Sequence, residues 1–293
     1  MYRYIRAEKA ADPEAKIELM CRLLGVSRSG YYDWCHRQDA GATGRAAENE
    51  VLVELIRQVH EDFRYYGAPR IREELRSGHP RVGRHRVARL MRDNGIRANR
   101  GKVKGRKRAA PPARRPEIVD LVQRDFHADV ENALWFTDVT QVRTGQGWLY
   151  AAVILDAFNR EVVTWAVDAY DTPKTVMTAL SDAIRIRHPP PGCIIHSDRG
   201  YQFTAHDWVN AATHDRLRVS MGERKSCFDN AAMESWFASF KNEEIYPNGQ
   251  PATRQEARNR LFRYVWTYNT RRLHSRLGYV APKTYATQSS ICP

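Results

Sequence analysis

The chain has 293 residues, of which 42% are hydrophobic, and it carries a formal net charge of +13. This composition is that of a globular protein with a sizeable core, and it excludes an intrinsically disordered chain. No apolar run approaches the ~20 residues that a membrane-spanning helix needs, and the chain begins without an apolar signal block, so we expect a cytoplasmic protein. The five cysteines are odd in number and form no CxxC pair, which argues against a disulfide framework or a zinc cluster.

The excess positive charge lies in the N-terminal part of the chain. Residues 1–117 hold 27 Lys or Arg against 15 Asp or Glu, whereas residues 118–293 hold 20 against 19. Because concentrated positive charge attracts a polyanion, we expect the N-terminal part to bind nucleic acid.

Residues 1–40 are predicted to hold two helices joined by a tight turn. Apolar residues at helical spacing over 14–24 end at Gly25, and Ser27 can cap a second short helix that runs through Trp34. This order is typical of a helix-turn-helix, and a plain helical hairpin would show the same pattern.

Residues 45–98 are predicted to form a second helical DNA-binding domain, after a flexible link at 41–44. Its third helix, over 82–94, ends at Gly95 and has several exposed arginines. Such a helix is usually a solvated charged face, but the concentrated positive charge favours phosphate contacts from Arg84, Arg86 and Arg89. Pro69 stands at the start of the second helix. The first helix places five apolar residues on one face: Val51, Leu52, Leu55, Ile56 and Val59.

Residues 99–117 are predicted to be a basic linker. The stretch 97–115 contains nine Lys or Arg and no acid, together with Gly and Pro, so it cannot bury a core. A nuclear localisation signal would have a similar composition. The cations that we expect to contact DNA here are Lys102, Lys104, Arg106, Lys107 and Arg108.

Residues 118–245 show three consecutive strand patterns and then alternating helices and strands. The predicted strands are 133–143, 148–156, 160–168, 193–198 and 217–220, and the predicted helices between them are 173–187 and 204–214. This order predicts an α/β, ribonuclease H-like fold with a mixed five-stranded sheet and flanking helices. Residues 246–293 are predicted to be a C-terminal helical extension, opened by the capping box Thr253–Glu256.

Three acids stand in apolar settings within this part. Asp138 lies inside a β-prone run, Asp198 ends the fourth strand, and Glu234 lies near the start of a helical pattern. Carboxylates buried together repel one another unless a cation neutralises them, and magnesium prefers such oxygen ligands. Two ions about 3.5–4 Å apart serve phosphodiester chemistry. The three acids therefore predict a divalent-metal site.

Three neighbouring polar residues are interpreted as structural. Asp156 ends the second strand and is expected to hold the turn before Arg160. Asp229 is most simply the N-cap of the helix that carries Glu234. His196 could tune Asp198, but a packed strand histidine is the commoner case.

The spacing of these motifs resembles a known family. Between Asp198 and Glu234 lie 35 residues, and Lys241 follows two helical turns later on the same face. This spacing resembles that of the D,D-thirty-five-E transposases and integrases. The sequence motifs are similar to those of the second-frame (OrfB-type) transposases of the IS-three insertion-sequence family. The segments that carry the match are 66–71, 135–140, 196–200, 229–231 with Glu234–Ser235, 240–243 and 268–274.

The resemblance implies a DNA transposase that performs metal-dependent 3′-end cleavage and strand transfer of an insertion sequence, through a circular intermediate. Asp138, Asp198 and Glu234 would be the catalytic ligands of two Mg²⁺ ions, with Mn²⁺ as a substitute, and Lys241 would contact DNA beside the cleavage site. The implied partners are terminal inverted repeats, target DNA, the upstream-frame (OrfA-type) product and further copies of the chain. The implied location is the bacterial cytoplasm, at the nucleoid when the protein is bound to DNA.

Two other functions would use parts of the same sequence. A nuclease would use the same metal site for hydrolysis alone, and a strand-transfer assay with a pre-cut DNA end separates it from a transposase. A non-enzymatic DNA-binding regulator would not need the three acids, and a cleavage test with magnesium separates it from an enzyme.

Overall fold

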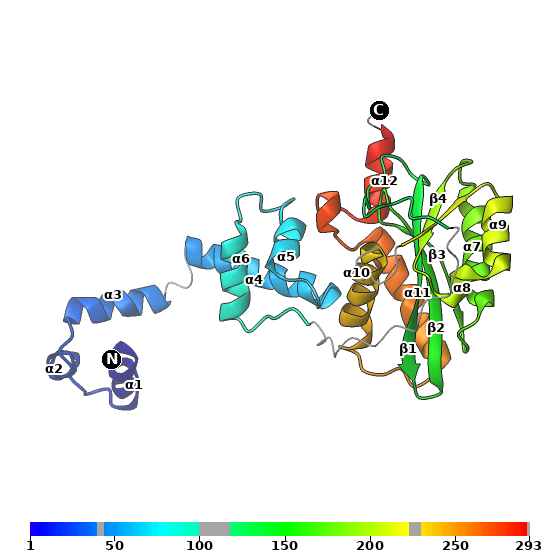
Figure 1. Cartoon of the computed structure of the whole chain (residues 1–293). Coiled ribbons are helices and arrows are strands. Elements are labelled where there is room, and N and C mark those ends of the chain that lie inside the picture. Colours follow the sequence, from blue (N-terminus) through cyan, green and yellow to red (C-terminus); the bar gives the residue numbers. More distant parts are fainter. Residues whose placement is uncertain (40–43, 100–117, 223–229, 292–293) are drawn as a thin grey trace. The chain divides into compact units, whose positions relative to one another are not determined.

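The computed structural model describes residues 1–39, 44–99, 118–222 and 230–291. They divide into two compact units, Met1–Ala98 and Asn99–Pro293. Figure 1 shows the helices of the first unit and the sheet of the second. Each unit has its own hydrophobic core, and each is described by itself.

The first unit begins with three short helices. Ile5, Cys21 and Tyr31 form their core. The second helix ends as predicted, because Gly25 adopts φ +63° and the Val26 N–H bonds back to the Cys21 carbonyl. The Ser27 hydroxyl accepts the Gly30 N–H at 3.2 Å, which confirms it as the cap of the third helix. The helices are α1 (Tyr2–Ala11), which the sequence pattern does not predict, α2 (Ile17–Leu23) and α3 (Arg28–Asp39).

Three further helices complete the first unit. Leu52, Ile56, Ile71 and Val87 are buried between them. The predicted buried face of the first of these helices is wrong at Val51, which is 55% exposed; Val53 points into the core in its place. The helices are α4 (Arg45–Asp62), α5 (Ala68–Leu75), which has Pro69 in its first turn, and α6 (Arg84–Asp93).

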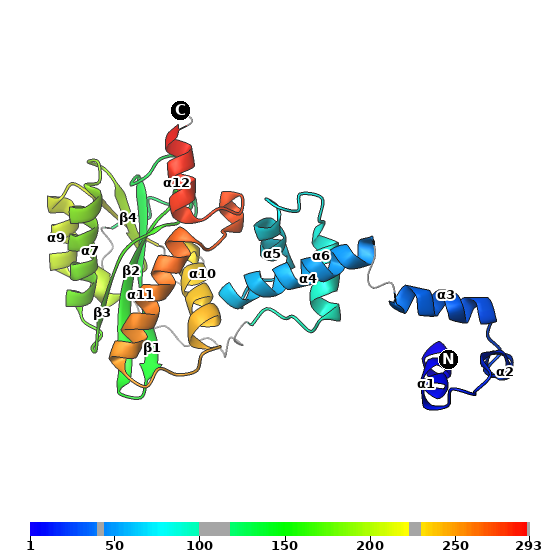
Figure 2. The same cartoon turned by 180° about the vertical axis from the view of Figure 1, so that it is seen from behind.

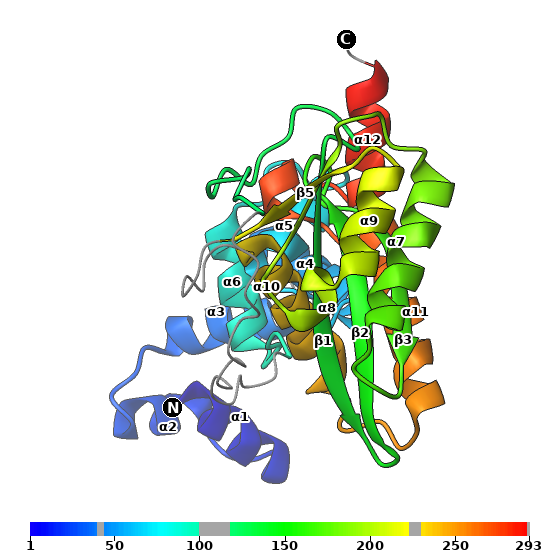
Figure 3. The same cartoon turned by 45° about the vertical axis from the view of Figure 1, so that its right-hand side comes forward.

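The second unit is built on a five-stranded mixed sheet with the order β3-β2-β1-β4-β5 (Figure 3). The pairs β1–β2 and β2–β3 are antiparallel, and the pairs β1–β4 and β4–β5 are parallel. This topology confirms the predicted ribonuclease H-like fold. The strands are β1 (Leu134–Thr144), β2 (Gly147–Asp156), β3 (Val162–Asp168), β4 (Ile194–Ser197) and β5 (Arg218–Met221).

Helices cover both faces of the sheet (Figures 1 and 2). Successive strand residues point to opposite faces, so Trp135 joins one core and Phe136 the other. The helices on the Trp135 side are α7 (Pro173–Arg187), α8 (Tyr201–Thr204) and α9 (His206–His214). Those on the Phe136 side are α10 (Ala231–Phe240) and α11 (Arg254–Thr270). The helix predicted over 204–214 is α9, which starts two residues later because Ala205 is extended, and the sequence pattern does not predict the short helix α8 before it.

The helix α11, predicted as part of a C-terminal extension, packs directly against the sheet. Leu261 and Tyr268 belong to the same core as Phe136. The Asn269 side chain bonds to both the N–H and the C=O of Val162, each at 2.9 Å, as a neighbouring strand would. The helix begins with the predicted capping box, in which Thr253 accepts the Glu256 N–H at 3.0 Å. A short final helix, α12 (Pro282–Ile291), follows.

Two further observations concern the chain as a whole. In the parts that the structure describes, no helix is both long and apolar enough to cross a membrane. Cys21, Cys35 and Cys193 are free thiols, and Cys227 and Cys292 lie outside the described residues.

Candidate active site

Asp138 lies in the middle of the longest strand, at the centre of the sheet. It pairs with Val153 of β2 and is half-buried. Strand alternation puts it on the same face as Phe136, which is the face that α10 covers. Its Oδ1 accepts the N–H of Val139 at 2.7 Å, which fixes one carboxylate oxygen.

Asp198 reaches the same place from the parallel neighbour strand. Phe136 of β1 pairs with His196 of β4, and continuing that register by two residues brings Asp198 alongside Asp138. The Asp198 Oδ1 accepts the Gly200 N–H at 2.8 Å. A Cβ at residue 200 would stand 2.8 Å from the Gln202 Oε1 and 2.9 Å from that oxygen, so a larger residue here would force these side chains to shift.

The arginine between these two residues has a structural role. The Arg199 guanidinium donates to the Gly222 carbonyl at 2.8 Å and to the Ile118 carbonyl at 2.9 Å. It therefore ties the end of β4 to the end of β5 and to the segment that enters the sheet.

Glu234 is brought to the site by the start of α10. The buried Asn230, in the N-cap position, donates through Nδ2 to the Thr137 carbonyl at 3.0 Å. This bond attaches the helix one residue from Asp138 and places Glu234 in the first helical turn. The predicted cap, Asp229, lies outside the described residues, and the helix starts one residue later than that prediction requires.

Lys241 follows at the other end of α10, where the helix widens into a π-helical turn, Lys241–Ile245. Such turns are rare and often stand at functional sites. This one is anchored by Glu243, which forms two bonds with the Arg272 guanidinium, at 2.6 and 2.7 Å, and accepts the Tyr264 hydroxyl at 3.0 Å.

The electrostatics show that these groups act on one another. Burial raises the pKa of Asp138 well above its ordinary value, and the Asp198 and Glu234 carboxylates add to the rise. The Val139 N–H and the Lys241 ammonium oppose it. Burial also raises the pKa of Asp198, while the hydrogen bond from the Gly200 N–H and the nearby His196 lower it. The cluster therefore holds more negative charge than its surroundings compensate.

These side chains share one open cleft of about 1080 Å³. Sequence reasoning identified its three acids and Lys241 but missed other lining residues, among them Arg143, Trp148, Tyr150 and Asp171. Arg143 lies over the Trp148 ring at 5.8 Å, and the two are paired across the β1–β2 hairpin. The Thr144–Gly147 turn in the sequence is the signal from which this pairing could have been predicted.

The donor set suits a hard divalent cation, since it consists of carboxylate oxygens. In the described residues, no three His, Cys, Asp or Glu side chains already stand as an assembled metal-binding group. The Asp198 and Glu234 carboxylates both raise the pKa of Asp138, so the three negative charges repel one another. A cation would remove that repulsion.

The other predicted DNA contacts belong to the first unit and to the linker. Arg84 and Arg89 are exposed on α6. Arg86 is not exposed as expected: it is largely buried, bonds to Asn49 at 2.9 Å and pairs with Glu48 at 3.0 Å, so it fastens α6 to α4. The predicted linker contacts lie outside the described residues: Lys102, Lys104, Arg106, Lys107 and Arg108.

Asp156 and His196 have the structural settings that were expected. The fully buried Asp156 carboxylate accepts the N–H groups of Asn132 and Phe158, at 2.8 and 2.9 Å, and so holds the turn after β2. The buried His196 Nδ1 lies 2.8 Å from the Ser220 hydroxyl, across the β4–β5 pair.

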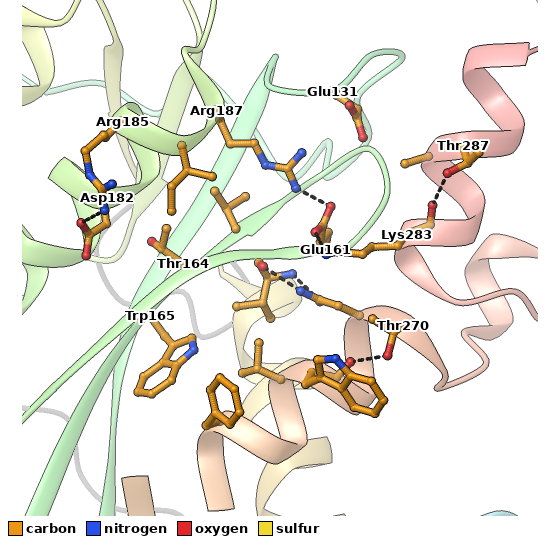
Figure 4. Close-up of a pocket in the computed structure, with 18 residues that line it drawn as sticks. Glu131, Glu161, Thr164, Trp165, Asp182, Arg185, Arg187, Thr270, Lys283 and Thr287 are labelled. Carbon is orange, nitrogen blue, oxygen red and sulfur yellow. Dashed lines mark hydrogen bonds and ion pairs between the residues drawn. The ribbon is translucent and has the colours of Figure 1, made fainter. Parts of the chain in front are cut away.

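A second pocket, of about 800 Å³, lies between β3, α7, α11 and α12 (Figure 4). None of the three acids lines it. Its charges are largely paired, because Glu161 bonds to Arg187 and Asp182 to Arg185. The Asn269–Val162 bonds also lie here. This pocket therefore lies where α11 and α12 meet the edge of the sheet, away from the three acids.

Comparison with known proteins gives matches to family models and to a solved structure. Residues 128–227 and 215–282 match models of the integrase core domain, and residues 46–104 match a model of an HTH-like domain. The catalytic core domain of HTLV-2 integrase, solved in complex with magnesium, is 17% identical, with a TM-score of 0.43 over 54% of this chain and 98% of that chain.

Curated relatives match over nearly the full length. The Insertion element IS600 uncharacterized 31 kDa protein of Shigella sonnei is 35% identical over 91% of this chain and 97% of its own length. Transposase InsF for insertion sequence IS3A of Escherichia coli (strain K12) is 33% identical over 98% of this chain and 99% of its own length. The chain belongs to the family of IS3 insertion-sequence transposases.

Proposed function

We propose that Asp138, Asp198 and Glu234 are the catalytic carboxylates of this transposase and that together they hold two divalent metal ions, Mg²⁺ with Mn²⁺ as a substitute. The observation that carries the proposal is their convergence in one cleft, from a central strand, its parallel neighbour and a helix attached one residue from Asp138. Bound there, such ions activate an attacking oxygen and stabilise a leaving oxygen in phosphodiester chemistry.

The protein's own groups orient the reaction. The Val139 and Gly200 N–H groups each fix one carboxylate oxygen, so Asp138 and Asp198 keep their direction without a ligand. Lys241, at the cleft wall, supplies a positive charge for a DNA phosphate beside the reacting bond. Arg143 and the Trp148 ring offer a charged and a flat apolar surface farther along the same wall. The cleft is open, as a polymeric substrate requires.

The reaction that we propose is cleavage at a 3′ end of the element, followed by attack of the freed 3′-hydroxyl on another phosphodiester. A strand-transfer assay with a pre-cut DNA end tests this directly. Joined products in Mg²⁺ support a transposase. Hydrolysis of the same DNA without joining would instead indicate a nuclease that uses the same acids.

DNA binding itself is assigned to the first unit and the linker. Arg84 and Arg89, exposed on α6, are proposed to contact phosphates, and so are the linker cations. If the segment 97–115 neutralises about six phosphates, the log affinity should fall with log salt at a slope of about −5 from this segment alone. Replacing its cations by Gln should flatten the slope by about one for each lost contact.

We further propose that specific end recognition needs the upstream-frame product, as a fusion or partner, and a homo-oligomer on DNA. Five of the described helices of the first unit have 12 residues or fewer, and the 18-residue α4 buries Leu52, Val53 and Ile56 within its own unit, so none presents a sustained heptad of apolar positions to a partner. A mobility-shift competition between terminal-repeat DNA and scrambled DNA of equal length tests this. Strong discrimination by this chain alone would contradict the proposal and place recognition in α1–α6.

A further inference from the structure

A small pocket behind α10 gathers positive charge. It measures about 250 Å³ and lies between α10, the turn after β2 and the segment after α11. Three arginines line it, Arg160, Arg272 and Arg276, and no carboxylate is among its described lining residues. Arg272 is paired with Glu243, which leaves two guanidinium charges facing the pocket.

The side chain of Arg160 is fixed at the wall of this pocket by its neighbours. It is only 6% exposed, donates to the Phe126 carbonyl at 2.6 Å and lies 5.9 Å from the centroid of the Phe136 ring. Its backbone adopts φ +60°, a conformation that glycine or asparagine would adopt at lower cost. Burial lowers the pKa of Arg160, and the nearby charge of Arg276 lowers it further, whereas Tyr268 and Asp156 raise it. The buried Arg160 and the exposed Arg276 thus place two like charges close to each other.

The remaining polar groups of the pocket include a buried donor and several hydroxyls that can donate. Trp236 is 2% exposed, lines the pocket, and its buried Nε1–H has no hydrogen-bond partner among the described residues. Ser235 and Ser239 add two hydroxyls from α10. Arginine and tryptophan side chains can donate hydrogen bonds but cannot accept them. A hydrogen-bond acceptor therefore suits the arginine and tryptophan groups of this pocket, and the guanidinium charges favour an anion.

We propose that this pocket binds a phosphate group. A carboxylate offers its two oxygens along one edge, whereas a phosphate offers oxygens on several sides, which suits guanidinium groups that come from different elements. In a protein that acts on DNA, the phosphate belongs either to the DNA backbone or to a small phosphate ion. The assignment rests on the family's DNA binding and not on the catalytic role of the acids, so the two can fail separately.

The first arm of the test uses inorganic phosphate. The thermal unfolding of the full chain is measured at about 10 mM phosphate and in chloride of equal ionic strength, where we expect phosphate to raise Tm by about 2–4 °C. Arg276→Gln removes an exposed guanidinium of the pocket, and Ser239→Ala removes a hydroxyl while keeping every charge. Both should lose most of the rise. Arg258→Gln, an exposed arginine of α11 that does not line the pocket, should keep it.

The second arm identifies the source of the phosphate. Duplex DNA binding is followed by fluorescence anisotropy over a range of salt concentrations. If a backbone phosphate fills the pocket, Arg276→Gln should flatten the slope of log affinity against log salt by about one relative to Arg258→Gln. Stabilisation by phosphate with equal slopes assigns the pocket to a small phosphate ion. Equal slopes with no difference in the phosphate-induced Tm rise would overturn the proposal and leave an acidic partner protein as the alternative ligand.

Discussion

The buried ion pair between Glu243 and Arg272 should stabilise the catalytic unit and position Lys241. Their side chains are only 7% and 4% exposed, and they share two hydrogen bonds, at 2.6 and 2.7 Å. Arg272 also lies 5.4 Å from the centroid of the Tyr268 ring. Replacing Arg272 by Met removes the charge while keeping most of the volume. It leaves Glu243 buried without its counter-charge, and we expect a loss of about 3–5 kcal/mol in the free energy of unfolding.

A double-mutant cycle separates the pair from general packing. Glu243→Gln alone leaves the Arg272 charge buried and should also destabilise strongly. The variant with both substitutions buries neither charge, so its loss should be smaller than the sum of the single losses by about 2 kcal/mol or more. Urea unfolding of the full chain, followed by tryptophan fluorescence, measures each term.

The same cycle tests the link to function. Because Lys241 begins the π-helical turn that Glu243 anchors, Arg272→Met should reduce strand joining even at temperatures where the variant remains folded. A single-variant loss below about 1 kcal/mol, or strictly additive losses, would refute the reasoning about the pair. Normal joining by a destabilised variant would refute its positioning role.

Three further predictions follow from other contacts. Burial raises the pKa of Asp156 from 3.8 to about 6, so the folded chain binds this proton more tightly than the unfolded chain and stability falls as pH rises through that window. Relative to Asp156→Asn, the wild type should lose about 3 kcal/mol of unfolding free energy between those two pH values, measured by urea unfolding. Gly200→Ala would bring a Cβ 2.9 Å from the Asp198 Oδ1, so strand joining should fall strongly at a temperature where the variant remains folded. Normal strand joining by the folded variant would contradict this. Arg86→Gln should lower the stability of the first unit by about 1 kcal/mol and leave the salt slope of DNA binding unchanged, whereas Arg89→Gln should flatten the slope by about one.

Much of the fold could be predicted because its signals are local. The helix α7 has the predicted bounds, 173–187, and each strand lies within two residues of its expected limits. Those elements are bounded by turn residues and filled by apolar patterns that depend on neighbours along the chain. The three acids could be identified for the same reason, since each is a charge inside or beside an apolar run.

The contacts that position the site are long-range and left no such signal. Asn230 bonds to Thr137, and Arg272 pairs with Glu243, but neither partner can be found from spacing within one element. Arg86 was expected to be exposed for a similar reason. Its helix looks solvated and basic, and only the packing of α4 against α6 brings Glu48 to it from far along the chain.

The central claim is that three of the four acids among the described lining residues of the cleft, Asp138, Asp198 and Glu234, perform the chemistry. Strand joining of a pre-cut DNA end in Mg²⁺ should be measured for Asp138→Asn, Asp198→Asn and Glu234→Gln. The control is Asp171→Asn, a fourth acid that lines the same cleft and accepts a hydrogen bond from Gln202. Each of the three should lose joining by at least about 100-fold with DNA binding retained, while the control stays within about 10-fold of the wild type. Near wild-type joining by any one of the three, or an equal loss in Asp171→Asn, would contradict the account.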